Sequence, residues 1–202
     1  MVLGTIQLSF ASGKPPSAEV RTNLVLLGGL IERITGEIAS EAKLKTGDSI
    51  SINVSKVEDG WIVVTAASSA LKTLGCSVFS TSDSTTSKKY LLDFTAADLS
   101  VRYDSMFNDS FLGTRSVRRT VSGTLRGQVL NTRTGEILSS SSRTVASADS
   151  VRINEIPGLE SVSVKSTHGE IPAESFLDRA VEPVMIIGAT GIAIYLFFHV
   201  RN

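Results

Sequence analysis

The sequence predicts an α+β domain, with helices packed on one face of a mainly antiparallel sheet that ends in a long hairpin, followed by a single C-terminal transmembrane helix. Three observations predict this fold class. Apolar residues recur every three or four positions over residues 17–44, which is the period of a helix. They alternate with polar residues over 117–129, which is the period of a strand. A largely apolar block runs from Pro183 to Val200.

The first half of the domain is predicted to mix helices and strands, without a regular βαβ repeat. Ser17 is a suitable N-cap for the first helix. Alternation over 50–54 predicts a strand with one buried face. Residues 61–75 fit a buried helix, although the β-branched and aromatic residues of 61–65 would also fit a strand. A short strand and a polar loop follow. Three glycines weaken the first helix and predict a kink or a break in it: Gly28, Gly29 and Gly36.

The second half reads as a run of long strands. Over 90–103 the apolar positions change from even to odd numbers, which predicts a β-bulge or bend near Ala97–Asp98. Gly135 can supply the positive φ of the turn in "NTRTGE" before a second hairpin arm over 137–145. The residues of the first arm that are predicted to face the core are Val117, Val121, Leu125 and Val129.

The C-terminal part is predicted to be a tether and an anchor. Pro, Gly and polar residues dominate 154–172, which predicts a tether after a domain over 17–153. Residues 173–202 are predicted to form a juxtamembrane and transmembrane helix, because the apolar block is close to the length that a bilayer core requires. A core helix is the competing interpretation, but core helices usually show a polar face. Small residues predict close packing against another helix in lipid: Gly188, Ala189, Gly191 and Ala193.

The N-terminus is compatible with a truncated signal peptide over residues 1–11. Its apolar stretch ends in Ser9-Phe10-Ala11, with small residues at the positions that precede a cleavage site. A basic n-region is missing, so a short strand or a disordered start is the alternative. Arg201 follows the apolar C-terminal block, which favours a cytoplasmic C-terminus and an extracytoplasmic or periplasmic domain. Both ends therefore predict the same orientation.

Composition excludes several classes of protein. The net charge is zero, which argues against recruitment of nucleic acid by a global field. Cys76 is the single cysteine, so an intrachain disulfide is impossible, and a buried structural thiol is the expected role. The two histidines, His168 and His199, lie apart from other candidate ligands. We therefore expect no catalytic residue, no metal and no cofactor, and no small-molecule substrate is evident.

Arginines concentrate in the long hairpin and suggest a contact surface. Among them Arg118, Arg126 and Arg133 are candidates for a partner-binding face. The alternative is a soluble outer sheet face whose charges protect an edge from aggregation.

Three stretches carry a resemblance to a known group of proteins: "ALKTLGCSVF", "YLLDFTAADLSVRY" and "VSGTLRGQVLNTRTGEILSS". Over about residues 47–145 the chain resembles the α/β periplasmic domains of the curli-export lipoprotein, of lipoprotein activators of penicillin-binding proteins, and of the TolB N-terminal domain. In those families a helix ends in Gly before a short strand, and the turn of a long hairpin carries a sequence like Thr134-Gly135-Glu136. Those lipoproteins are anchored by a lipidated N-terminal Cys, which this chain replaces with its C-terminal helix. The resemblance implies a non-catalytic envelope module that binds or assembles partners.

Together these observations predict a non-enzymatic, single-pass membrane protein. Its extracytoplasmic domain would act in envelope assembly or scaffolding by protein–protein contact, with the bilayer and an unknown protein as its partners. The alternative is a tail-anchored accessory subunit of a membrane complex, with the domain in the cytoplasm. A membrane-tethered enzyme is the third class, and it would need a polar pocket with perturbed carboxylates.

Overall fold

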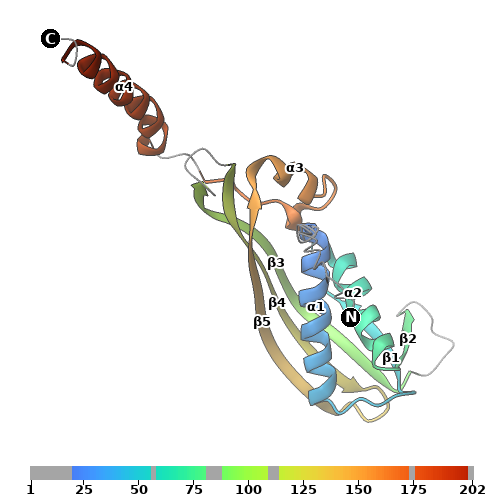
Figure 1. Ribbon diagram of the computed structural model, residues 1–202. Coiled ribbons are helices and arrows are strands. Elements are labelled where there is room, and N and C mark those ends of the chain that lie inside the picture. The colour runs from blue at the N-terminus through green and yellow to red at the C-terminus, as the bar shows by residue number, and fades with distance from the viewer. Residues whose placement is uncertain (1–19, 56–57, 81–87, 109–113, 173–175, 200–202) are drawn as a thin grey trace, which may run out of the picture.

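The computed structural model describes residues 20–55, 58–80, 88–108, 114–172 and 176–199. Its strands form one five-stranded sheet in the order β2-β1-β3-β4-β5, and helices α1 and α2 cover one face of it (Figure 1). This confirms the α+β class. The sheet is mixed rather than mainly antiparallel, because β1 is parallel to both β2 and β3. Only the pairs β3–β4 and β4–β5 are antiparallel.

Helix α1 (Asn23–Glu41) begins at Thr22, whose hydroxyl accepts a hydrogen bond from the N–H of Val25 at 3.4 Å. The predicted cap, Ser17, lies outside the described residues. The helix continues unbroken through all three glycines that predicted a kink. Burial of one apolar stripe against the sheet holds it, since tertiary packing usually contributes more to a helix than intrinsic propensity. The fully buried residues of this stripe are Leu27, Ile31, Ile34 and Ile38.

Strand β1 (Ser49–Val54), helix α2 (Gly60–Thr73) and strand β2 (Ser77–Ser80) form a parallel βαβ unit, which the sequence analysis did not expect. The strand alternative for residues 61–65 is wrong. These residues continue a helical stripe whose buried members share the core with α1: Ile62, Val63, Ala66, Ala67 and Leu71. The β-branched residues lie in a helix here because burial outweighs their weak local preference.

Strands β3 (Tyr90–Asn108), β4 (Arg115–Asn131) and β5 (Ile137–Arg152) are longer than predicted and form the antiparallel part of the sheet. The four residues of β4 predicted to face the core are completely buried. Gly135 has φ of 72° in the β4–β5 turn, as predicted.

The phase change in β3 is real, but its position differs from the prediction. The register against β4 skips Thr95, not Ala97 or Asp98, and it skips again at Ser105. The apolar pattern misplaced the bulge because small residues beyond Thr95 give little contrast between the two faces.

The expected tether over 154–172 is instead a packed segment, which contains η1 (Ile153–Glu155), α3 (Ile156–Leu159) and η2 (Lys165–Thr167). Ile156, Leu159 and Val164 are at most 6 % exposed and join the core clusters. Pro and Gly suggested a loop, yet a few well-placed apolar residues fix this segment against the end of the sheet.

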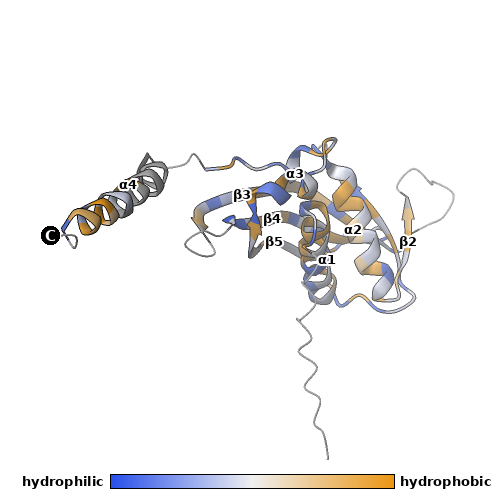
Figure 2. Ribbon diagram, turned by 45° about the horizontal axis from the view of Figure 1, so that its top comes forward, coloured by the Kyte–Doolittle hydropathy of each residue, from blue (hydrophilic) through white to orange (hydrophobic). Residues whose placement is uncertain are grey.

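Helix α4 (Phe176–His199) follows, and Figure 2 shows that its last turns are rich in apolar residues. Its first turns carry the charged residues Asp178, Arg179 and Glu182. Within the described part of the chain, no helix combines the length and the apolar character that crossing a membrane requires. The transmembrane span that we expected over 173–202 is therefore not supported.

Candidate interaction surface

The face of the sheet opposite α1 and α2 is polar and open. Because side chains alternate along a strand, the even-numbered residues of β4 between Arg118 and Gln128 point away from the helices. Each of them is exposed or half-buried. The register places Asp98 and Thr144 on either side of Thr124, and Ser100 and Ala146 on either side of Ser122. We call this surface of β3, β4 and β5 the open face.

Side chains on the open face bond to one another across the strands. The hydroxyls of Ser100 and Ser122 lie 2.9 Å apart, and so do those of Thr124 and Thr144. The amide of Gln128 donates to Asp93 at 3.2 Å. Such cross-strand pairs stabilise a sheet and hold the side chains in fixed positions. The open face is thus an ordered array of hydrogen-bond donors and acceptors on the curved strands β3, β4 and β5 (Figure 1).

The predicted arginines occupy this region but do not form one site. Arg118 and Arg126 both lie on the open face, exposed, and at about 3.4 Å per residue they are roughly 27 Å apart along β4. Arg133 lies in the exposed β4–β5 turn. Arg118 is opposite Asp104 in the register. The arrangement offers separate positive points and does not concentrate charge enough to hold an anion.

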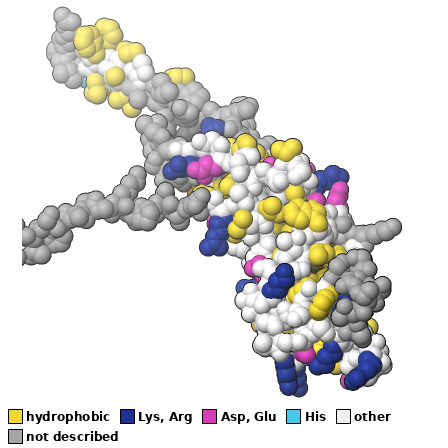
Figure 3. Space-filling model, turned by 90° about the vertical axis from the view of Figure 1, so that its right-hand side faces the viewer, with side chains coloured by type: hydrophobic (Ala, Val, Ile, Leu, Met, Phe, Trp, Pro, Cys, Tyr) yellow, Lys and Arg dark blue, Asp and Glu magenta, His cyan; other side chains and the backbone are white. Residues whose placement is uncertain are grey.

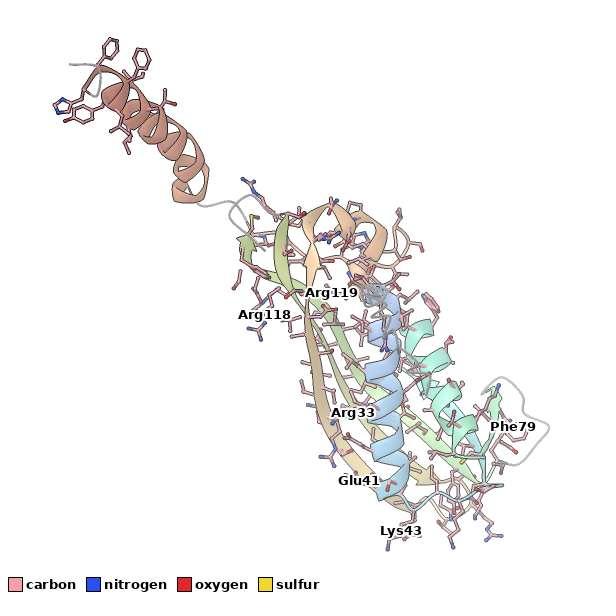
Figure 4. All side chains as sticks on the ribbon, in the orientation of Figure 1. Arg33, Glu41, Lys43, Phe79, Arg118 and Arg119 are labelled. Carbon is pink, nitrogen blue, oxygen red and sulfur yellow. The ribbon has the colours of Figure 1, made fainter. Side chains whose placement is uncertain are left out.

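Arg119, the neighbour of Arg118, is buried rather than exposed, and it was not among the predicted site residues. Its side chain is completely buried beside the first turn of α1, whereas Arg118 points outward (Figure 4). Its Nη1 donates to the carbonyl of Arg21 and to Oδ1 of Asn23, both at 2.8 Å. Its Nε donates to Asp149 at 2.8 Å. The alternation of β4 was the available signal, because 119 is an odd position on a strand whose odd positions face inward.

Asn23 extends this buried network to the C-terminal segment. Its Nδ2 donates to the hydroxyl of Tyr103 at 2.9 Å and to the carbonyl of Thr167 at 2.7 Å. Burial raises the pKa of the Tyr103 hydroxyl, and the charge of Glu160 adds to this, while the bond from Asn23 acts in the other direction. The side chains of Asn23, Tyr103 and Arg119 all have hydrogen-bond partners within the chain. The network therefore connects α1, the sheet and residues 160–169, and its role is structural.

Among the described residues, no group of His, Cys, Asp or Glu could hold a metal ion. Cys76 is buried, its Sγ lies 3.6 Å from the carbonyl of Lys45, and burial raises the pKa of its thiol. A raised thiol pKa disfavours the nucleophilic thiolate. Nδ1 of His168 lies 3.0 Å from the carbonyl of Val164, a local contact. In the described structure the contacts of Cys76 and His168 are therefore structural.

Two further surfaces expose apolar side chains. Figure 3 shows such side chains gathered on the side of the domain that α2 forms, where Trp61 and Val64 are exposed. On α4, apolar side chains from Ile187 to Phe198 are exposed, and the two glycines of its small-residue strip, Gly188 and Gly191, face open space. Ala193 is exposed on the same helix. The side chain of Ala189 lies outside the described residues.

No family model matches this chain, and no curated protein matches it. Several solved structures resemble it at low similarity, and three of them are described here. The C-terminal domain of LpoB from Salmonella enterica is 13 % identical, with 59 % of this chain and 97 % of that chain covered and a TM-score of 0.34. A putative neuraminyllactose-binding hemagglutinin homolog from Helicobacter pylori is 16 % identical, covers 55 % of this chain and 68 % of its own, and has a TM-score of 0.33. A minor lipoprotein from Acinetobacter baumannii is 14 % identical, with 55 % and 69 % covered and a TM-score of 0.33.

The LpoB domain and the minor lipoprotein give a weak structural resemblance of the type predicted, to lipoprotein activators of penicillin-binding proteins. The resemblance to the curli-export lipoprotein and to the TolB N-terminal domain stays a prediction. TM-scores of 0.33 and 0.34 are too low for the likeness to carry an argument about function.

Proposed function

We propose that this chain is a non-enzymatic, envelope-associated module that acts by contact with another protein through its open face. The observation that supports this is the array of bonded hydroxyls between Arg118 and Arg126, which no helix of the described residues covers. Ordered polar side chains on a rigid sheet can pair with a partner at a small cost in conformational entropy. Separated arginines at the two ends of the array would fix the orientation of an acidic partner surface.

Site-specific photo-crosslinking in the native host tests this proposal. A photoreactive residue at Ser122, in the middle of the open face, is expected to crosslink to a second protein. The matched control is the same residue at Glu32, which is exposed on α1. The double variant R118E/R126E should abolish the crosslink from Ser122, whereas R33E on α1 should leave it unchanged. Equal crosslinking from Glu32, or none from Ser122, would contradict the proposal.

The location of the domain is part of the same proposal. We place it outside the cytoplasm, because Ser9-Phe10-Ala11 after an apolar stretch resembles the end of a secretory signal peptide. Protease added to cells stripped of any outer barrier should then digest the domain without lysis. Protection until lysis would instead favour the cytoplasmic accessory subunit.

Helix α4 is proposed to hold the domain at a membrane surface. Ile187, Ile192 and Phe198 are each more than 60 % exposed, and large exposed apolar areas usually mark a contact surface. Replacing Ile192 and Phe198 with Ser should release the chain from washed membranes. V162S is the control, because Val162 is an exposed apolar residue outside α4. Membrane recovery that is equal for both variants would exclude this role of α4.

The small residues of α4 are proposed to pack against another helix, since they allow close approach of two backbones. Changing them to Leu should reduce crosslinking between α4 and its neighbour while leaving membrane recovery unchanged. The residues concerned are Gly188, Ala189, Gly191 and Ala193.

A further inference from the structure

Strand β5 leaves one edge of the sheet unpaired over its whole length. It is the last strand in the sheet order, has 16 residues, and pairs only with β4 in the described part of the chain (Figure 1). The opposite edge is β2, which has only 4 residues. Short edge strands are one way in which proteins prevent edge-to-edge association. Strand β5 therefore offers another strand a much longer unpaired edge than β2 does.

The hydrogen-bonding groups on the free edge belong to the even-numbered residues of β5. The carbonyl of Phe94 accepts a hydrogen bond from the N–H of Ser55, the residue after β1, at 2.9 Å. At this end of β3 the backbone groups of the even residues therefore point toward β1, and those of the odd residues point toward β4. The register then directs the backbone groups of Gln128 toward β3 and those of Val129 toward β5. Since Val129 is opposite Ser139, the odd residues of β5 face β4. The even residues from 140 to 150 face outward.

This edge lacks several of the usual protective features, although it carries one charge of each sign, Arg143 and Asp149. The sequence from Ser140 to Ser150 contains no Lys, no Pro and no Gly. Its register against β4 is continuous from Ser139 to Arg152, with the one irregularity near the turn. Its side chains are mostly Ser, Thr and Ala, which do not obstruct a neighbouring strand. Natural edge strands usually carry charges, prolines or bulges that block such pairing.

We propose that a second copy of this chain occupies this edge, with the two β5 strands antiparallel and centred on Ala146. A twofold axis at Ala146 pairs residues whose numbers add up to 292. Ser140 of one copy then lies opposite Arg152 of the other, and the two Ala146 residues lie opposite each other. Directly opposite residues then point to the same face, as an antiparallel ladder requires. Both copies keep α1 on the same side of one continuous sheet.

Charge complementarity selects this register. Within each copy Arg143 pairs with Glu41, and Asp149 pairs with Arg119. In this register Arg143 of each copy lies directly opposite Asp149 of the other copy, so the two pairs are joined with opposite charges adjacent, and such charges attract. Moving the centre by one residue would place Arg143 opposite Ser147 or opposite Val151, and both contacts with Asp149 would be lost. The two side chains can be reached from the edge, because 41 % of Arg143 and 45 % of Asp149 is exposed.

Disulfide trapping in the full chain tests both the contact and its register. In a hydrogen-bonded antiparallel pair the Cα atoms are about 5.5 Å apart, within the range of a disulfide. Under mild oxidation A146C should become mainly a disulfide-linked dimer. S142C is the matched control, because Ser142 faces Ser150 of the second copy in this register and should not crosslink. The native Cys76 is buried and provides the background in the unmodified chain.

The hydrogen bonds of the edge are tested separately by the size of the particle in solution, measured by analytical ultracentrifugation in one mild detergent. The native chain should be a dimer. A146P, which removes one outward N–H at the centre, should be monomeric. A146V has a similar volume and keeps that N–H, so it should stay dimeric, and circular dichroism should show both variants folded.

Three results would overturn the inference: a monomeric native chain, failure of A146C to crosslink, or an A146P variant that remains dimeric. The last would assign the association to another surface, such as α4. The inference is independent of the proposed function, which uses the open face and not the edge. Pairing of the edge with a strand of a different protein would give a monomeric purified chain.

Discussion

Arg119 of β4 and Asp149 of β5 lie directly opposite each other and form an ion pair with very unequal exposure. The Arg119 side chain is completely buried, whereas 45 % of the Asp149 side chain is exposed. The guanidinium also bonds to Arg21 and Asn23. The charge of Arg119 is therefore enclosed by the protein, whereas the Asp149 carboxylate is in contact with solvent. Substitution of the two residues should therefore change the free energy of unfolding by different amounts.

Replacing Arg119 with Ala should lower the free energy of unfolding by about 3–5 kcal/mol, because it leaves a cavity and removes the donor from Oδ1 of Asn23 and from the carbonyl of Arg21. Arg118→Ala is the matched control. That side chain is exposed on the next position of the same strand, so the loss should stay within about 0.5 kcal/mol. Chemical denaturation of both variants measures the difference. Equal losses would show that Arg119 is not enclosed as described.

Gly169 lies where a side chain cannot fit. A Cβ at this position would be 2.8 Å from the ring of Tyr103 and 2.9 Å from the carbonyl of Val101. Gly169→Ala should therefore destabilise the domain by about 1–3 kcal/mol, as overpacking does. It should also expose residues 160–172 to limited proteolysis.

Gly158 provides the control for this substitution, since a Cβ there meets nothing within 4 Å. Gly158→Ala should leave the melting temperature and the proteolysis pattern close to those of the native chain. If both variants behaved alike, the packing of the C-terminal segment on Tyr103 would be refuted.

The regular parts of the fold could be predicted from the sequence, because they depend on periodic burial. The inward face of β4 and the stripe of α1 follow directly from periods of two and 3.6. The parallel pairing of β1 with β3 could not be predicted in this way. It depends on contacts between segments that are distant in sequence, and a local pattern does not specify which strand a neighbour will be.

The surface was predicted less completely than the core. Alternation correctly placed Arg118 and Arg126 on an outer face, but grouping the arginines of the hairpin by charge obscured the position of Arg119. The segment over 154–172 was misread for a related reason. Its few apolar residues, such as Ile156 and Leu159, have no period, and only the shape of the sheet end shows that they are buried.

The ion pair between Asp48 and Lys89 predicts a stability that depends on pH. The two side chains are 2.9 Å apart. Burial would raise the pKa of Asp48, but hydrogen bonds from Lys89 and from the N–H of Lys45 hold it below its ordinary value of 3.8. Hydrogen bonds with Tyr90 and Asp48 raise the pKa of Lys89 above 10.5. The pair should therefore stabilise the fold fully between these two values.

The stabilising effect of Asp48 is lost as the pH falls through its lowered folded-state pKa, because the folded state then also binds the proton. The effect of Lys89 is lost as the pH rises above 10.5. The difference in melting temperature between the native chain and D48N should thus be constant near neutral pH and disappear in acid, once the pH lies below the lowered folded-state pKa of Asp48. A difference that persists unchanged into acid would refute the assignment.

The thiol of Cys76 should react slowly in the folded chain. Its burial both excludes reagents and raises the pKa, so little thiolate is present at neutral pH. A disulfide reagent at pH 7 should modify it more slowly than in the urea-unfolded chain, because the buried Sγ is shielded from the reagent and the raised pKa leaves less thiolate. A cysteine introduced at exposed Ser142 gives the reference rate for an accessible thiol. If Cys76 reacted as fast as that reference, its position between α2 and β2 would be wrong, and the background in disulfide trapping at Ala146 would have to be removed by Cys76→Ala.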